Sequence, residues 1–281
     1  MPFSDIELSR RLERTEAQAC ARFAEARRRI YPESGAEWME CAGAYAIFDG
    51  VDSPVTQSFG LGIFEELRAA SLEVIERFFT ERGAPVFHEV SPLAGVAALD
   101  LLCARGYRPV EISSVMYRPV EPPAAEIRRD IRVRVIGPEG AQFWTGVSAR
   151  GWSQEHPELG EFLLQVGVIS AGREQSVCFL AEIDGEAGAT GMLCIHDGVA
   201  LFAGASTAPE LRRRGLQAAL LTERMRYAYE HGCDLAMMVA QAGSDSQRNG
   251  ERRGFRIAYT RTKWGLRSGL LSDGREIHDP A

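Results

Sequence analysis

Three consecutive arginines stand beside one glycine in the segment STAPELRRRGLQAALL, which begins at Ser206. The apolar residues after Gly215 recur with helical spacing, so we expect Gly215 to open a helix. A helix N-terminus has unpaired N–H groups and a partial positive charge, and both favour a bound phosphate. Side chains of Arg212, Arg213 and Arg214 would add charge and forked donors. The segment predicts a pyrophosphate site; a solvated basic helix start is the alternative.

The context of this segment resembles the pyrophosphate-binding motif of the GNAT superfamily of acyl-CoA-dependent N-acyltransferases. In that family a strand runs into V-x-P-E-x-[RQ]-x-x-G-x-[GA]-x-A-L-L. Two positions depart from the motif: Thr207 stands where valine is common, and Gln217 stands where the family has glycine or alanine. The resemblance covers residues 131–266, and the matching residues are Pro209, Glu210, Arg212, Gly215, Ala219, Leu220 and Leu221.

The resemblance implies that acetyl-CoA is the co-substrate. By it, the strand end should pair with the pantetheine arm, and the following strand should splay away to leave a slot for the thioester. The amides of residues 213–218 should hold the pyrophosphate. Ser246 and Asn249, at the start of the next helix, are weaker candidates, with a structural helix cap as the alternative. The other coenzyme-binding candidates are Ala205, Ser206, Thr207, Arg212, Arg213, Arg214, Gly215, Leu216, Gln217 and Ala218.

The two halves of the chain end alike. Each ends with a helix stopped by glycine, a strand, a helix, a Gly-aromatic turn and a strand, so that Gly83 matches Gly232 and Gly106 matches Gly254. This repetition predicts an internal duplication, hence an α/β fold with mixed sheets and two GNAT-like domains in tandem. The expected parts are a degenerate domain (1–120), a proline-marked linker (121–130), a catalytic acetyl-CoA-binding domain (131–268) and a C-terminal tail (269–281).

The first half also satisfies the phosphate motif literally, at Gln57, Gly60 and Gly62. We interpret this match as chance, because aligning the repeated glycines places Glu66 opposite Gly215. Carboxylates of Glu65 and Glu66 at a helix start would stabilise the helix but repel an anion. The N-terminal copy is therefore expected to hold no coenzyme and to shape or cover the acceptor side.

Acetyl transfer to an amine needs a base for the amine proton, an N–H donor for the developing oxyanion and a proton donor for the leaving thiolate. In many members of the family the last is a tyrosine four residues before the Gly-aromatic pair, where this chain has Gly250. Tyr259, on the last strand beside the slot, is the substitute candidate. Glu155 is the candidate base, with His156 and Glu158 in the same loop. Structural or solvated roles are the alternatives for all four.

The composition of the chain bears on what the protein binds and where it is located. The chain has 281 residues and a formal net charge of −7, which argues against a nucleic-acid surface. No apolar run reaches the length of a membrane span, and the charged N-terminus does not resemble a secretory signal, so a cytoplasmic location is expected. Six cysteines without a C-x-x-C pair predict free thiols and no metal site.

The leading functional hypothesis is an acetyl-CoA-dependent N-acetyltransferase. It would transfer the acetyl group directly to a small-molecule or peptide amine in a ternary complex, as a monomer or homodimer. A non-catalytic acyl-CoA-binding or sensing protein is the alternative, because Gly250 occupies the position of the usual acid. A third possibility is that both halves are active. The sequence does not identify the acceptor amine.

Overall fold

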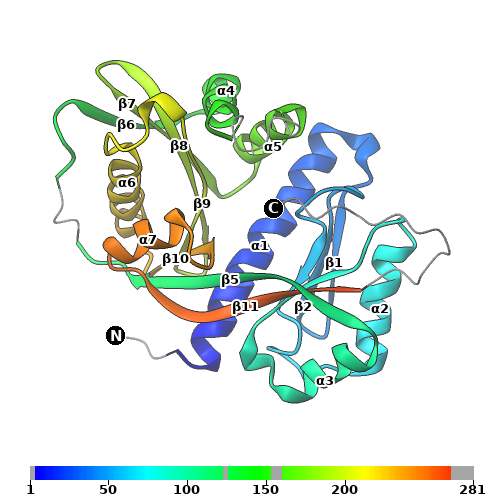
Figure 1. Ribbon diagram of the computed structural model, residues 1–281. Coiled ribbons are helices and arrows are strands. Elements are labelled where there is room, and N and C mark those ends of the chain that lie inside the picture. The colour runs from blue at the N-terminus through cyan, green and yellow to red at the C-terminus, as the bar shows by residue number, and fades with distance from the viewer. Residues whose placement is uncertain (1–3, 123–125, 153–159, 267–281) are drawn as a thin grey trace.

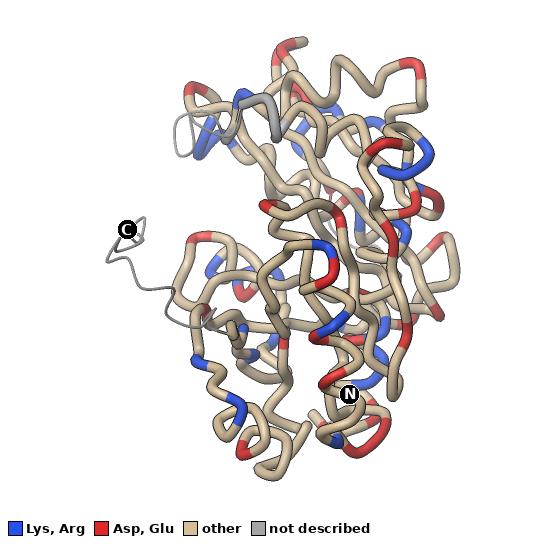
Figure 2. The backbone as a smooth tube through the Cα atoms, turned by 90° about the vertical axis from the view of Figure 1, so that its right-hand side faces the viewer, with Lys and Arg blue, Asp and Glu red and all other residues tan. Residues whose placement is uncertain are grey.

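The computed structural model describes residues 4–122, 126–152 and 160–266. Within these residues the chain forms one sheet of eleven strands with helices on both faces (Figure 1). None of the described helices is both long and apolar enough to cross a bilayer. All six cysteines are free. Acidic and basic residues are mixed over both halves of the molecule (Figure 2).

Each half contains both helices and strands. The N-terminal half contains α1 (Ile6–Ile30), β1 (Glu37–Cys41), β2 (Ala44–Phe48), β3 (Gln57–Phe59), α2 (Ala69–Thr80), β4 (Phe87–Val90), α3 (Val96–Ala104) and β5 (Tyr107–Pro119). The C-terminal half contains β6 (Ile131–Ile136), α4 (Ala141–Trp152), α5 (Gly160–Gly172), β7 (Ser176–Ile183), β8 (Glu186–His196), β9 (Val199–Thr207), α6 (Leu216–Glu230), β10 (Leu235–Gln241), α7 (Asp245–Arg252) and β11 (Arg256–Leu266).

Turn residues in the sequence set the hairpins of the C-terminal half. Asp184 and Gly185 join β7 to β8, and Asp197 and Gly198 join β8 to β9. All four residues have positive φ, which is the backbone that a two-residue hairpin turn with the right twist requires. Local backbone chemistry therefore fixes where the meander turns.

Strand pairing repeats between the two halves. In the N-terminal half, β1 and β2 are antiparallel, β2 and β3 are antiparallel, and β3 and β4 are parallel. The same pattern recurs from β7 through β8 and β9 to β10. The repeated pattern supports the predicted duplication and gives two GNAT-like folds in tandem.

The last strand of each half joins the other half. The sheet order is β1-β2-β3-β4-β11-β5-β10-β9-β8-β7-β6, so β11 lies between β4 and β5, and β5 lies between β11 and β10. The two predicted domains therefore share strands. The boundary at residues 121–130 stays a prediction, and its residues 123–125, like the predicted tail, lie outside the described part of the chain.

Helix α1 crosses the junction between the halves (Figure 1) and packs on strands from both. It is capped by Asp5, whose side chain accepts a hydrogen bond from the backbone N–H of Leu8. Leu8 and Leu12 are buried, and they pack in one cluster with Trp144 of α4. The opposite face of the C-terminal sheet packs against α6, whose apolar side chains include Leu220.

A cluster of buried charges ties α1 to the shared strands. The guanidinium of Arg261 on β11 lies 3.5 Å from Glu13, 2.6 Å from Glu16 and 3.0 Å from Glu89 of β4, measured to carboxylate oxygens. The hydroxyl of Tyr259 donates to Glu13 at 2.8 Å. A buried ion pair is strongly destabilised when one partner is removed, so this cluster makes α1, β4 and β11 depend on one another.

Glu13 should make stability depend on pH. Burial, opposed by the charge of Arg261, raises the pKa of Glu13 from 4.5 to about 7. Between these values the folded state holds a proton that the unfolded state has released, so the free energy of unfolding falls as pH rises through this window. Because glutamine cannot ionise, we expect Glu13→Gln to gain roughly 1–3 kcal/mol relative to the wild type between pH 5 and pH 8.

Urea denaturation of both proteins at the two pH values measures this effect. The exposed Glu126 provides the control, because Glu126→Gln should follow the wild type at both values. A constant difference between Glu13→Gln and the wild type would show that Glu13 has the same pKa in the folded and unfolded states.

Candidate functional site

The strands β9 and β10 separate part of the way along the sheet. Their parallel register runs from Val199 opposite Leu235 to Leu201 opposite Met237 and ends there. Beyond this point β9 continues to Thr207, while β10 continues to Gln241 on its other neighbour, β5. The two strands therefore separate between residues 202–207 and 238–241, as the resemblance implied, and we call this separation the slot.

A β-bulge lies in the β9 wall of the slot. Thr190 pairs with Ser206 and Met192 pairs with Ala203, so Gly204 and Ala205 both stand opposite the single residue between Thr190 and Met192. Gly204 has a φ of +60°, and both bulge residues are exposed. A bulge takes backbone groups out of the ladder. The bulge therefore frees backbone groups from β8 in a part of β9 that no longer pairs with β10.

Helix α6 begins at the mouth of the slot. Gly215 is its N-cap with a φ of +96°, and its first intrahelical bond runs from Ala219 N to Gly215 O at 3.0 Å. The amides of Leu216, Gln217 and Ala218 therefore lie ahead of the helical ladder and can bind an anion. This is the predicted arrangement for a pyrophosphate.

The side chain of Gln217 explains its departure from the family motif. Its Nε2 donates to Ser206 O and to Thr207 Oγ1, both at 2.8 Å. Ser206 is buried, and its hydroxyl donates to Ser148 O of α4 at 2.8 Å. These bonds hold the strand end between α4 and α6, which glycine or alanine at position 217 could not do through a side chain.

The three arginines point to different partners. Arg212 donates to Thr207 O and to Gly151 O, so its side chain holds the strand end against α4. Arg213 is exposed and has a φ of +62°, a strained backbone that recurs at ligand sites. Arg214 pairs with Asp184 at 3.1 Å.

Arg128, which the sequence reasoning missed, also reaches the helix start. Its Nη1 donates to Arg214 O at 2.9 Å and lies 3.4 Å from the position that a Cβ on Gly215 would take. Arg128 lies in the predicted linker, 86 residues before Arg214. No local pattern connects the two positions, so only the fold reveals this guanidinium, which also pairs with Asp130.

Two candidates on α7 have different positions from those expected. Ser244, not Ser246, caps the helix, because the Ser244 hydroxyl accepts from Gln247 N at 3.2 Å. Ser246 and Asn249 lie inside α7 and are exposed. The prediction that Ser246 caps the helix is wrong by two residues, since three polar residues in a row all suit a helix start.

Gly250, which stands where the family often has a tyrosine, is closely packed against two methionines. A Cβ there would lie 2.7 Å from Met238 Sδ and 3.4 Å from Met116 Cε. A larger side chain at this position would therefore require Met238 to move. The chain therefore has no proton donor at this position.

The structure does not place Tyr259 beside the slot, and that expectation is wrong. β11 pairs with β5, where Tyr259 stands opposite Val115, so a whole strand separates it from β10. Its hydroxyl donates to Glu13, and burial together with the charge of Glu13 raises the pKa of Tyr259 well above its usual value. The candidates Glu155, His156 and Glu158 lie outside the described residues.

The N-terminal copy differs at the corresponding helix. The repeat alignment predicted that Glu65 and Glu66 open a helix. Instead α2 begins at Ala69 with Arg68 at its N-cap, so the two glutamates lie in the preceding loop. A Cβ on Gly60 would meet the ring of Phe64 at 2.8 Å. The absence of a coenzyme from this half stays a prediction.

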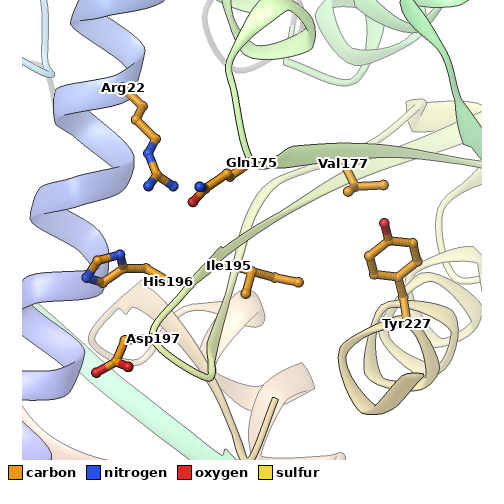
Figure 3. Close-up of a pocket in the computed structure, with 7 residues that line it drawn as sticks. All are labelled: Arg22, Gln175, Val177, Ile195, His196, Asp197 and Tyr227. Carbon is orange, nitrogen blue, oxygen red and sulfur yellow. The ribbon is translucent and has the colours of Figure 1, made fainter. Parts of the chain in front are cut away.

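A separate pocket of about 450 Å³ lies at the other end of β9 (Figure 3). Arg22 of α1, His196 at the end of β8 and Asp197 of the hairpin turn are among the residues that line it. It lies beside the start of β9, whereas the slot lies at the end. Within the described residues no cluster of three His, Cys, Asp or Glu side chains could hold a metal ion.

The position of Tyr259 generates a prediction. We expect Tyr259→Phe to lower the free energy of unfolding by roughly 1 kcal/mol, because a buried hydrogen bond to Glu13 is lost. Acetyl-CoA affinity and turnover per folded molecule should not change, since β5 separates Tyr259 from the slot. Urea denaturation, calorimetry and initial rates measure the three quantities. Lower turnover at unchanged stability would restore Tyr259 as a proton donor.

Comparisons with known proteins agree with this geometry. Residues 142–255 match the family model described as "Acetyltransferase (GNAT) family". The comparison with curated proteins finds no match. This family uses acetyl-CoA as co-substrate, so the match supports acetyl transfer from acetyl-CoA as the general chemistry.

Solved structures share the fold over most of the chain. A GCN5-related N-acetyltransferase from Kribbella flavida has a TM-score of 0.68 and 18% identity, covering 95% of this chain and 98% of its own. A GCN5-related N-acetyltransferase from Sphaerobacter thermophilus has a TM-score of 0.54 and 19% identity, covering 81% of this chain and 78% of its own. A tandem GNAT protein from the clavulanic acid biosynthesis pathway, solved without AcCoA, has a TM-score of 0.57 and 12% identity, covering 79% of this chain and 77% of its own. The C-terminal half thus contains a segment that matches the GNAT acetyltransferase family, and the chain shares the fold of tandem GNAT structures over both halves.

Proposed function

We propose that the C-terminal half transfers an acetyl group from acetyl-CoA directly to the amine of a small molecule or peptide, in a ternary complex. The observation that carries the proposal is the slot between β9 and β10, which opens directly onto the start of α6. An extended arm fits between separated strands, and an anionic group fits the helix start.

The residues around the slot suit acetyl-CoA in three ways. The amides of Leu216, Gln217 and Ala218 would hold the pyrophosphate, with Arg213 adding positive charge. The strand end from Ala205 to Thr207 would pair with the pantetheine arm. The backbone N–H groups freed by the bulge would face the carbonyl oxygen, where negative charge develops during transfer.

Bound acetyl-CoA supplies the acetyl group as a thioester, and the chain must position the amine and remove its proton. Glu155 is our candidate for the base. The alternative, an acyl-CoA-binding or sensing protein without catalysis, is favoured by Gly250, because many members of the family have a proton donor at this position.

An acetyl-CoA consumption assay with a panel of small amines and peptides separates these functions. We expect at least one amine to accelerate release of the coenzyme thiol, and calorimetry to give one equivalent of acetyl-CoA per chain. Tight coenzyme binding without acceleration by any amine would favour the sensing protein. Two equivalents would show that the N-terminal half also binds.

Substitutions of Gly215 test whether the start of α6 binds the pyrophosphate of acetyl-CoA. Any side chain there occupies a left-handed backbone, so Gly215→Ala and Gly215→Glu carry the same strain and differ in bulk and charge. We expect Gly215→Glu to bind acetyl-CoA at least about tenfold more weakly than Gly215→Ala, because its carboxylate repels the phosphates. Arg213→Ala should cost roughly 1–2 kcal/mol of binding free energy.

The matched change in the other half is Arg68→Glu, at the exposed N-cap of α2. It should leave acetyl-CoA affinity unchanged if that half holds no coenzyme. Gly60→Ala is a poorer control because of the contact with Phe64. Equal acetyl-CoA affinities for the two Gly215 variants would refute pyrophosphate binding at Gly215. Weaker acetyl-CoA binding by Arg68→Glu would refute the prediction that the N-terminal half holds no coenzyme.

A further inference from the structure

Arg224 is a buried cation on the inner face of α6. It is 2% exposed, and its guanidinium stacks on the ring of Phe202 at 4.8 Å. Among the described residues no carboxylate pairs with it, and burial lowers its pKa to about 9, so it remains charged at neutral pH. Arg27 and Arg261, which are also buried, both have carboxylate partners.

Stability does not explain this residue. A buried charge without a counter-charge is costly, and apolar residues of similar volume often replace buried ionic groups with no loss of stability. The neighbouring inward positions of α6, Leu220, Leu221 and Ala228, are apolar. A local choice that costs stability is expected at functional sites.

The hydrogen bonds of Arg224 place it directly behind the bulge. Nη1 donates to Met192 O at 3.2 Å and to Ala203 O at 3.3 Å, and Nε donates to Leu220 O at 3.3 Å. Met192 and Ala203 are the paired residues next to the bulge. A Cβ on Gly191, opposite the bulge, would lie 3.0 Å from Arg224 Cζ, so this glycine provides the space for the guanidinium.

This position coincides with the start of the slot. The last β9–β10 pair is Leu201 with Met237, and Ala203 is two residues further along β9. The irregular ladder at the bulge makes additional donors to nearby carbonyls valuable. Arg224 supplies them from the face of the sheet opposite α1, and so holds the bulged backbone in one orientation.

We propose that Arg224 is a positioning residue for acetyl transfer. By holding the carbonyls of Met192 and Ala203, it directs the N–H groups of the bulge at Gly204 and Ala205 into the slot, toward the acetyl carbonyl oxygen. Its charge, in apolar surroundings, adds a positive potential where negative charge develops. The inference rests on the proposed function.

The same potential favours departure of the thiolate at a site without a tyrosine donor. During transfer the amine nitrogen bonds to the carbonyl carbon, and the carbon–sulfur bond breaks with its electron pair going to sulfur. The amine proton passes to the solvent or to a base. A nearby fixed positive charge lowers the free energy of the sulfur anion without giving it a proton.

The test compares Arg224→Met and Arg224→Lys with the wild type. Arg226→Met is the matched control, because Arg226 lies on the same helix and is more exposed, paired with Glu223. The measurements are the unfolding temperature, acetyl-CoA affinity, the infrared carbonyl band of bound acetyl-CoA labelled with ¹³C at the carbonyl, and kcat and KM with the best amine.

We expect Arg224→Met to unfold at the same or a higher temperature and to bind acetyl-CoA within about threefold of the wild type. Its carbonyl band should move toward the frequency of free acetyl-CoA, and kcat should fall at least about tenfold with little change in KM. Arg224→Lys should give a carbonyl band and a kcat between those of Arg224→Met and the wild type. Arg226→Met should match the wild type in both.

Several results would overturn the inference. An unchanged carbonyl band in Arg224→Met would show that Arg224 does not orient the bulge, even if no amine is turned over. A lower unfolding temperature or failure to fold would show a structural role instead. A wild type that does not bind acetyl-CoA would refute the proposed function itself, whereas binding with an unchanged band refutes only the role of Arg224.

Discussion

The antiparallel ladder between β5 and β11 is the contact on which the rest of the structure depends. It runs from Arg256 opposite Tyr117 to Leu266 opposite Tyr107 and forms the centre of the sheet. Each strand comes from one half and lies between strands of the other, so neither half has a complete sheet of its own. Arg261 adds electrostatics to this geometry, since its carboxylate partners come from α1 and β4.

The slot follows from this exchange. β10 is paired with β5 along its whole length, while β9 is paired with β8 up to its end at Thr207. Each wall is thus held by a different neighbour, and one of these neighbours belongs to the N-terminal half. Separation of β9 from β10 therefore needs no bound molecule to maintain it. The N-terminal half contributes to the site through β5 whether or not it binds a coenzyme.

Features that depend on local backbone chemistry could be predicted from the sequence. Gly215 opens a helix, and the Asp-Gly pairs make hairpin turns, because positive φ limits which residues fit. Features that depend on distant packing could not. The exchange of β5 and β11 removed Tyr259 from the slot, and Arg128 reached the helix start from the linker. The exact ends of helices could be predicted only approximately from the sequence, because any of several polar residues near Ser244 could have served as the N-cap.

Two buried arginines show how position separates structure from function. Arg261 lies among three carboxylates at the junction of the halves, and its charge is balanced by groups that also need it. Among the described residues the hydrogen bonds of Arg224 all go to carbonyl oxygens, so no carboxylate neutralises its charge. Carbonyl dipoles can hold a guanidinium but leave a net positive potential around it. That potential lies beside the bulged wall of the slot, where a reaction that creates negative charge would use it.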